Sequence, residues 1–195
     1  MGTFAEGIES IRLACSLVLL IPALGIVLFG RRRRVLVPTW IATMTLVAWL
    51  RFVGWWELEP SGFLHVLAGI VLLGLAIAAW QRDDTATDVA TTALAATIAA
   101  WTWVPCVGRH LGEILNAARA EPWRQLPPTV AFMVGLSIPL VVLAALDVAA
   151  PQLGERLDHR FVRIGGLAIV AVVGGLVSVT LFDDLAGELA RRSSF

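Results

Sequence analysis

The chain has 195 residues, of which 58% are hydrophobic and 15% charged, and its formal net charge at pH 7 is zero. A soluble domain has about a quarter of its residues charged, so the composition excludes an ordinary water-soluble globular domain. The balanced charge also gives no reason to expect a nucleic-acid partner.

The apolar residues form long blocks that are separated by short charged, proline-containing or glycine-containing breaks. Most blocks have roughly 18–25 residues, which is the length that crosses about 30 Å of hydrocarbon as a helix. The six blocks cover approximately residues 8–30, 35–54, 62–80, 89–118, 129–149 and 161–182. We therefore predict an all-α polytopic membrane protein in which six transmembrane helices form a single domain over residues 1–195.

Arginine sets the expected orientation, because the chain has no lysine. The first, third and fifth connections carry eight arginines, including the run from Arg31 to Arg34, and the opposite side carries six. Positive residues close to a span favour the cytoplasmic side. We therefore predict a multi-pass cell-membrane protein with this run in the cytoplasm and both termini outside it. The run also has the charge to bind anionic lipid head groups.

The first three and the last three blocks resemble two copies, over about residues 1–82 and 87–195. The first block of each copy carries one of the two cysteines, Cys15 and Cys106, and the second carries a proline, Pro38 or Pro139. Three spans is an odd number, so the second copy is expected to be inverted in the bilayer. Inverted repeats place the working site near the midplane, where the two halves meet.

The expected depths of the two cysteines in the membrane overlap. At 1.5 Å per residue, Cys15 lies roughly 10 Å below the outer edge, and Cys106 lies roughly 4–15 Å below it. A disulfide between them is geometrically allowed, although the sequence does not fix the separation of their Cα atoms.

The stretch WTWVPCVGRHLGEIL, residues 101–115, contains proline, glycine and three ionisable residues close to the second cysteine. Pro105 has no backbone N–H donor and favours a break in the helix, and Gly108 makes the helix less stable near the same position. If a helical segment restarts there, Cys106 falls in its first turn. The helix dipole and unpaired N–H groups of a first turn favour a thiolate.

Three ionisable residues follow at helical spacing. Arg109 and His110 come three and four residues after Cys106, and Glu113 comes four and three residues after them, so one helix face can hold all four. This arrangement would activate the thiol of Cys106. Alternatively, the fourth block ends near Gly108 and the three groups are ordinary interfacial residues, while the cysteines are inert buried thiols.

These residues resemble the CcdA family of cytochrome c biogenesis proteins and the transmembrane domain of the DsbD thiol-disulfide reductases. The family motif PCxGPxLxxIL corresponds to PCVGRHLGEIL, Pro105–Leu115, and a GLxxP pattern corresponds to Gly135–Pro139. An SPCxxPLLP-like segment corresponds to LACSLVLLIP, Leu13–Pro22. The chain departs from the family in having Ala14 and Arg109 where the family has proline, and Val18 stands where a second first-span proline would be.

The resemblance implies a thiol-disulfide relay without a cofactor. Cytoplasmic thioredoxin would reduce a Cys15–Cys106 disulfide, and the dithiol would reduce a thioredoxin-like protein outside, as in cytochrome c maturation. Pro22, Pro105, Gly108 and Pro139 are the candidates for allowing the motion that exposes the cysteines to each side. Whether such an electron carrier counts as an enzyme, a thiol-disulfide oxidoreductase, stays open.

Two other function classes remain open from the sequence. One is a small-solute or metal-ion transporter of similar inverted-repeat build, in which Arg109, His110 and Glu113 line the path. The other is a non-catalytic membrane subunit of a larger complex. A relay requires both cysteines, whereas a transporter would tolerate loss of Cys15 but not of Glu113.

Overall fold

The computed structural model describes residues 3–11, 14–30, 32–54, 62–82, 84–102, 117–149, 160–178 and 188. These residues form helices and contain no strand, which confirms the predicted all-α class. The helices with assigned bounds are, in chain order, α1 (Thr3–Ser10), α2 (Ala14–Phe29), α3 (Arg33–Val53), α4 (Gly62–Arg82), α5 (Thr85–Thr102), α7 (Pro122–Leu136), α8 (Ile138–Ala149) and α10 (Arg160–Ser178).

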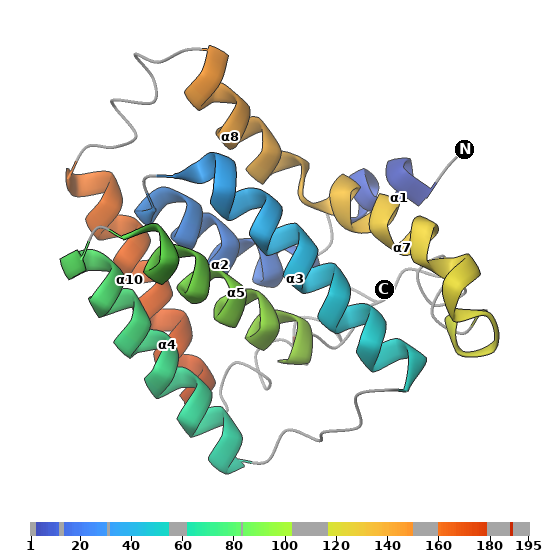
Figure 1. The fold of residues 1–195 in the computed structure, drawn as a ribbon, viewed down its shortest axis with the longest axis horizontal. Coiled ribbons are helices and arrows are strands. Elements are labelled where there is room, and N and C mark those ends of the chain that lie inside the picture. The colour runs from blue at the N-terminus through green and yellow to red at the C-terminus, as the bar shows by residue number, and fades with distance from the viewer. Residues whose placement is uncertain are drawn as a thin grey trace.

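Helices α2, α3, α4 and α5 run in alternating directions between two ends of the bundle, whereas α7 and α8 follow one another in the same general direction (Figure 1). At one end, the ring of Phe29 at the end of α2 stacks on that of Trp80 near the end of α4, and Arg163 near the start of α10 contacts both rings. We call this the cationic end, because the turn between α2 and α3 carries the arginine run.

The opposite end gathers the end of α3, the start of α4, the end of α5 and the start of α7. Arg51 of α3 contacts Trp101 of α5, His65 of α4 stacks on the same tryptophan, and Trp49 of α3 contacts Trp123 of α7. We call this the tryptophan end. The chain closes α3 here with Gly54, whose φ of 82° allows its N–H to bond back to the carbonyl of Arg51.

The core is formed by buried residues of α2, α3, α4, α5, α7, α8 and α10, which are mostly aliphatic, together with Trp40 and Met44 of α3 and Phe132 and Met133 of α7. The central helix α5 is rich in alanine and threonine, which lets its neighbours approach closely. Its buried hydroxyls are satisfied within the helix, since Thr91 and Thr92 donate to the carbonyls of Thr87 and Asp88. These two threonine hydroxyls can therefore be buried without partners from other helices.

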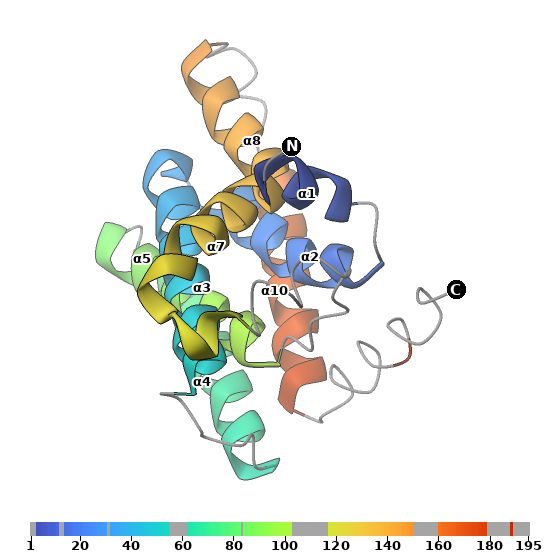
Figure 2. The same cartoon turned by 90° about the vertical axis from the view of Figure 1, so that its right-hand side faces the viewer.

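The segment predicted as the fifth span is bent. Its helices α7 and α8 meet at an angle of 59° around Ser137, close to Pro139, which the sequence marked as a candidate place of movement within a single predicted span. Pro139 lacks the N–H that would bond to the carbonyl of Gly135, so a continuous α-helical ladder is not possible here. We call this bend the α7–α8 elbow. Figure 2 shows α8 projecting beyond the rest of the bundle.

The first predicted block is also divided. Residues 3–10 form the separate short helix α1, and the apolar helix α2 begins only at Ala14. Helix α1 lies against α7 (Figure 2). The two helices meet at Gly7 and Gly135, where a Cβ atom on either residue would meet the backbone of the other helix.

Among the described residues, two helices are long and apolar enough to cross a membrane, α4 over Gly62–Gln81 and α10 over Arg160–Val177. A third span results if the two arms of the α7–α8 elbow are counted as one. Both α4 and α10 present large apolar side chains outward, such as Phe63 and Phe161, which are 75% and 77% exposed. Membrane character thus rests on two or three helices, and the six-span arrangement stays a prediction.

Candidate functional site

The structure describes only part of the predicted redox site. Cys15 is the second residue of α2, Pro22 lies inside that helix, and Pro139 is the second residue of α8. Helix α2 continues through Pro22 without interruption. The remaining predicted site residues lie outside the described part of the chain, namely Pro105, Cys106, Gly108, Arg109, His110 and Glu113.

The end of α5 is the last described part of the chain before the stretch with Cys106. Helix α5 ends at Thr102, and one guanidinium nitrogen of Arg51 lies 2.5 Å from the carbonyl oxygen of Trp101 and 3.4 Å from that of Ala100. The last carbonyls of a helix have no partners within it, and a cation also interacts favourably with the negative end of the helix dipole. Arg51 therefore fixes the last turn of α5, four residues before Cys106.

A histidine packs against the same turn. The rings of His65 and Trp101 are stacked, with centroids 5.8 Å apart and planes only 10° from parallel. His65 is 3% exposed, so its ring is held inside the tryptophan end rather than in solvent. Together, Arg51 and His65 attach α3 and α4 to the residue from which the chain runs into the motif around Cys106.

The tryptophan end is extended by a second pair of aromatic rings. The indole N–H of Trp49 donates to the carbonyl oxygen of Pro122 over 3.3 Å, and the ring of Trp49 lies 5.4 Å from that of Trp123. These contacts bind the start of α7 to the end of α3. The structure thus anchors the helices on both sides of the stretch 103–116, through Trp101 before it and Pro122 after it.

The cationic end uses arginine in a similar way. Arg33 is only 1% exposed, and its Nε donates to the carbonyl oxygen of Val27 over 3.0 Å. Arg163 donates from Nε to the carbonyl oxygen of Phe29 over 3.2 Å, while its guanidinium lies 5.1 Å from the ring of Trp80. Both arginines donate to carbonyls in the last turn of α2. These carbonyls have no N–H partner within the helix, because the helix ends there.

Sequence reasoning missed these roles of Arg33, Arg51, His65 and Arg163. It treated Arg33, Arg51 and Arg163 as charges that set orientation, and it gave His65 no role in the site. One signal was present for Arg51, which lies in the last turn of a predicted span next to Gly54, where a long cationic side chain can reach neighbouring helix ends. Nothing in the sequence distinguishes the buried Arg33 from its exposed neighbours Arg32 and Arg34.

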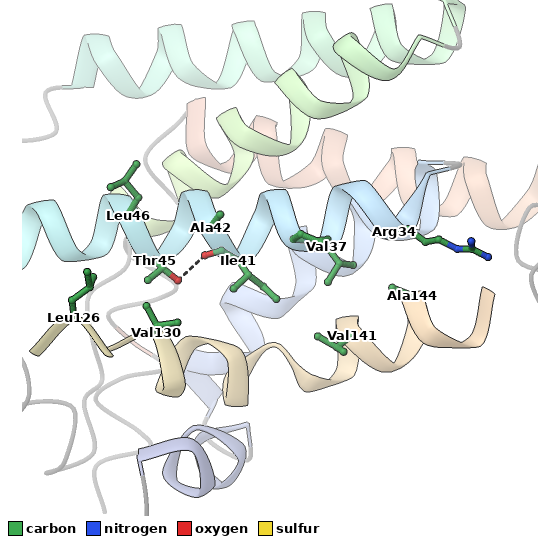
Figure 3. Close-up of a pocket in the computed structure, with 11 residues that line it drawn as sticks. Arg34, Val37, Ile41, Ala42, Thr45, Leu46, Leu126, Val130, Val141 and Ala144 are labelled. Carbon is green, nitrogen blue, oxygen red and sulfur yellow. Dashed lines mark hydrogen bonds between the residues drawn. The ribbon is translucent and has the colours of Figure 1, made fainter. Parts of the chain in front are cut away.

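A groove runs between α3 and the α7–α8 elbow, with a volume of about 590 Å³. Its floor and walls are almost entirely apolar, and the one hydroxyl among them, on Thr45, donates to the carbonyl oxygen of Ile41. Figure 3 shows Arg34 at one end of the groove and Leu46 and Leu126 at the other. We call it the α3 groove.

The chain matches no protein-family model, no curated protein and no solved structure. Within the described residues, no three histidine, cysteine or carboxylate side chains are grouped so that they could hold a metal ion. The functional argument therefore depends on the chain's own residues.

Proposed function

We propose that this protein is a transmembrane thiol-disulfide relay that carries reducing equivalents from cytoplasmic thioredoxin to a thioredoxin-like protein outside, with Cys15 and Cys106 as the redox pair. The resemblance of PCVGRHLGEIL to the CcdA and DsbD motif suggests the chemistry. Arg109, His110 and Glu113 remain the groups that we expect to activate or orient the thiol of Cys106.

The observation that carries this proposal is the antiparallel packing of α2 and α5. These helices contact each other, and α5 begins at the cationic end, where α2 finishes beside Trp80. Helix α2 therefore begins, with Cys15 as its second residue, on the side of the bundle where α5 ends. Three residues lie between Thr102 and Cys106, so four residue steps limit their Cα separation to about 14 Å. This reach is what supports the proposal that the two cysteines form a pair.

The proposed chemistry is two successive thiol-disulfide exchanges. A thiolate of reduced thioredoxin attacks the Cys15–Cys106 disulfide and forms a mixed disulfide, which releases one relay cysteine as a thiolate. The second thioredoxin thiol then attacks the thioredoxin sulfur of the mixed disulfide, which forms thioredoxin's own disulfide and releases the other relay cysteine. The relay then holds two thiols and has gained two electrons and two protons. Attack by one of these thiols on a disulfide of the outside partner restores the Cys15–Cys106 disulfide and leaves that partner reduced.

The relay requires access to both sides of the membrane, and the proposed architecture provides it through six spans in two inverted repeats, over about residues 1–82 and 87–195. Both termini lie outside in this arrangement, and the cationic end faces the cytoplasm. The proposed places of movement are Pro22, Pro105, Gly108 and Pro139. The α7–α8 elbow supports this assignment for Pro139, since the helix there is already interrupted.

The test is the redox state of the two cysteines in cells, with and without thioredoxin reductase activity. Cells are quenched with acid and free thiols are alkylated with a mass tag, so that each reduced cysteine shifts the protein in a gel. We expect two tagged thiols in normal cells and an untagged, intramolecularly bonded form when thioredoxin reductase is absent.

The variants Cys15→Ser and Cys106→Ser are the matched controls, because neither can form the intramolecular disulfide. Each should keep one taggable thiol in both genetic backgrounds. If the wild-type protein shows two tagged thiols in both backgrounds, the relay proposal is wrong. A transporter that depends on Glu113 would then be the next candidate.

A further inference from the structure

The α3 groove has no role in the relay, and its composition restricts what can occupy it. Along its length the lining is aliphatic, and the hydroxyl of Thr45 already donates to Ile41. A polar or charged ligand inside the groove would lose its hydration without gaining hydrogen bonds, which is costly. The occupant is therefore an apolar chain or an apolar side of another molecule.

The length of the groove matches one leaflet of a membrane. The lining residues of α3 run from Arg34 to Leu46, which is twelve residue steps, or about 18 Å of helix. The hydrocarbon core of a bilayer is about 30 Å thick, so a single leaflet contributes about 15 Å. A groove volume of about 590 Å³ also falls within the range of pockets that hold small-molecule ligands.

Among the described residues that line this apolar groove, Arg34 is the charged one, and it lies at one end. Arg34 is exposed at the first turn of α3, and its side chain points beyond the groove in Figure 3. The exposed Arg32 lies beside it, and the N-terminus of α3 adds the positive end of a helix dipole. An occupant with an anionic group at one end and an apolar chain behind it would satisfy both parts of the surface.

We propose that the α3 groove binds one acyl chain of an anionic phospholipid, with the lipid phosphate against Arg34. Because Arg34 belongs to the arginine run, the bound lipid comes from the leaflet on the cationic side. The proposal requires insertion in a membrane but not the thiol relay, so each can fail without the other. A bound lipid would hold α3 against both arms of the α7–α8 elbow.

The test is photo-crosslinking of the full chain in vesicles that contain phosphatidylglycerol and phosphatidylcholine in equal amounts. One preparation carries a trace of phosphatidylglycerol with a photoactivatable group in the acyl chain, the other carries a trace of phosphatidylcholine with the same group, and labelled peptides are identified by mass spectrometry. We expect labelling of α3 near Ile41 and of the elbow near Val130 and Val141. One arginine at an anionic surface favours binding by about 1 kcal/mol, so phosphatidylglycerol should label these sites about fivefold more than phosphatidylcholine.

Two pairs of variants separate the head-group contact from the chain contact. Arg34→Gln should remove the preference for phosphatidylglycerol and keep the labelling, whereas Arg32→Gln, which changes an exposed arginine outside the groove lining, should keep most of the preference. Ala42→Trp should fill the groove and abolish its labelling in both lipids. Ala171→Trp places the same side chain on the exposed face of α10, away from the groove, and should leave the labelling unchanged.

Four results would overturn the proposal. Equal labelling from both lipids would remove the role of Arg34, and equal losses in Arg32→Gln and Arg34→Gln would indicate a diffuse positive surface rather than a site. Groove labelling that survives Ala42→Trp would show that the acyl chain lies elsewhere. A photoreactive amino acid at Val130 that crosslinks to a second copy of the chain instead of lipid would identify the groove as a dimer contact.

Discussion

Single arginine side chains close the ends of helices in this protein. Arg33 and Arg163 bond to carbonyls at the end of α2, and Arg51 bonds to carbonyls at the end of α5. Each of these donors comes from a different helix from the one it closes, so the contact also joins two helices. In an apolar bundle, unpaired carbonyls are costly, and a long side chain with several donors is well suited to satisfy them.

For a single side chain, we predict that Arg51→Ala lowers the free energy of unfolding of the protein. It removes hydrogen bonds from a charged donor to the last turn of α5, and such bonds contribute about 1.5–3 kcal/mol each. Thermal unfolding in detergent should show a clearly lower midpoint. Arg51→Lys should recover part of the loss, because an ammonium group can still reach a carbonyl.

Arg124→Ala is the matched control for this prediction. Arg124 makes an ion pair with Glu121 at 3.0 Å, but its side chain is 79% exposed. Exposed pairs contribute about 0–1 kcal/mol, so the midpoint should change little. Equal effects of Arg51→Ala and Arg124→Ala would contradict the capping role of Arg51.

At the scale of the helices, two pairs of helices pack closely at glycine residues. Helices α2 and α10 cross at Gly25 and Gly166, and a Cβ atom on Gly166 would lie 2.6 Å from both the carbonyl oxygen of Gly25 and the amide nitrogen of Phe29. Helices α1 and α7 cross in the same manner at Gly7 and Gly135. Small residues that let two backbones approach closely are the usual means of joining helices in membranes.

The crossing of α2 and α10 can be tested with two adjacent glycines. Gly166→Ala should destabilise the protein by about 1–3 kcal/mol, since the added methyl group meets backbone atoms that cannot rotate away. Gly165→Ala is the control, because a Cβ atom there meets nothing within 4 Å. Alanine is the better helix former by up to about 1 kcal/mol, so the control should be neutral or slightly more stable in the same unfolding experiment. If both variants behave alike, the two helices do not cross at Gly166.

At the scale of the whole molecule, the apolar blocks predicted the long helices well. The blocks at 35–54, 62–80 and 161–182 correspond to α3, α4 and α10, with ends that differ by a few residues. Long runs of apolar residues bounded by arginine or glycine leave few alternatives to a helix of that length. The all-α class was therefore contained in the hydropathy pattern.

Other features depend on contacts that a hydropathy pattern does not contain. The bend at Ser137 lies in an unbroken apolar run, and α1 is too short and too polar to form an apolar block. Burial of Arg33 depends on the position of α2, not on its own neighbours in sequence. The candidate site was predicted only in part, since Cys15 and Pro139 are placed in helices while the pairing with Cys106 stays a prediction.

The alternating directions of the helices lead to a test of the six-span arrangement. In a Cys15→Ser, Cys106→Ser background, single cysteines replace exposed residues at the two ends of the bundle, Arg32, Asp84 and Arg160 at the cationic end and Gly62 and Arg124 at the tryptophan end. A membrane-impermeant maleimide added to intact cells should label the tryptophan-end positions only, and the cationic-end positions should react only after the membrane is opened. The physical reason is that every connection at one end lies on one side of the membrane if each intervening helix crosses it. Labelling of Arg32→Cys and Gly62→Cys from the same side would show that α3, the helix between them, does not span, and the six-span arrangement would then be wrong.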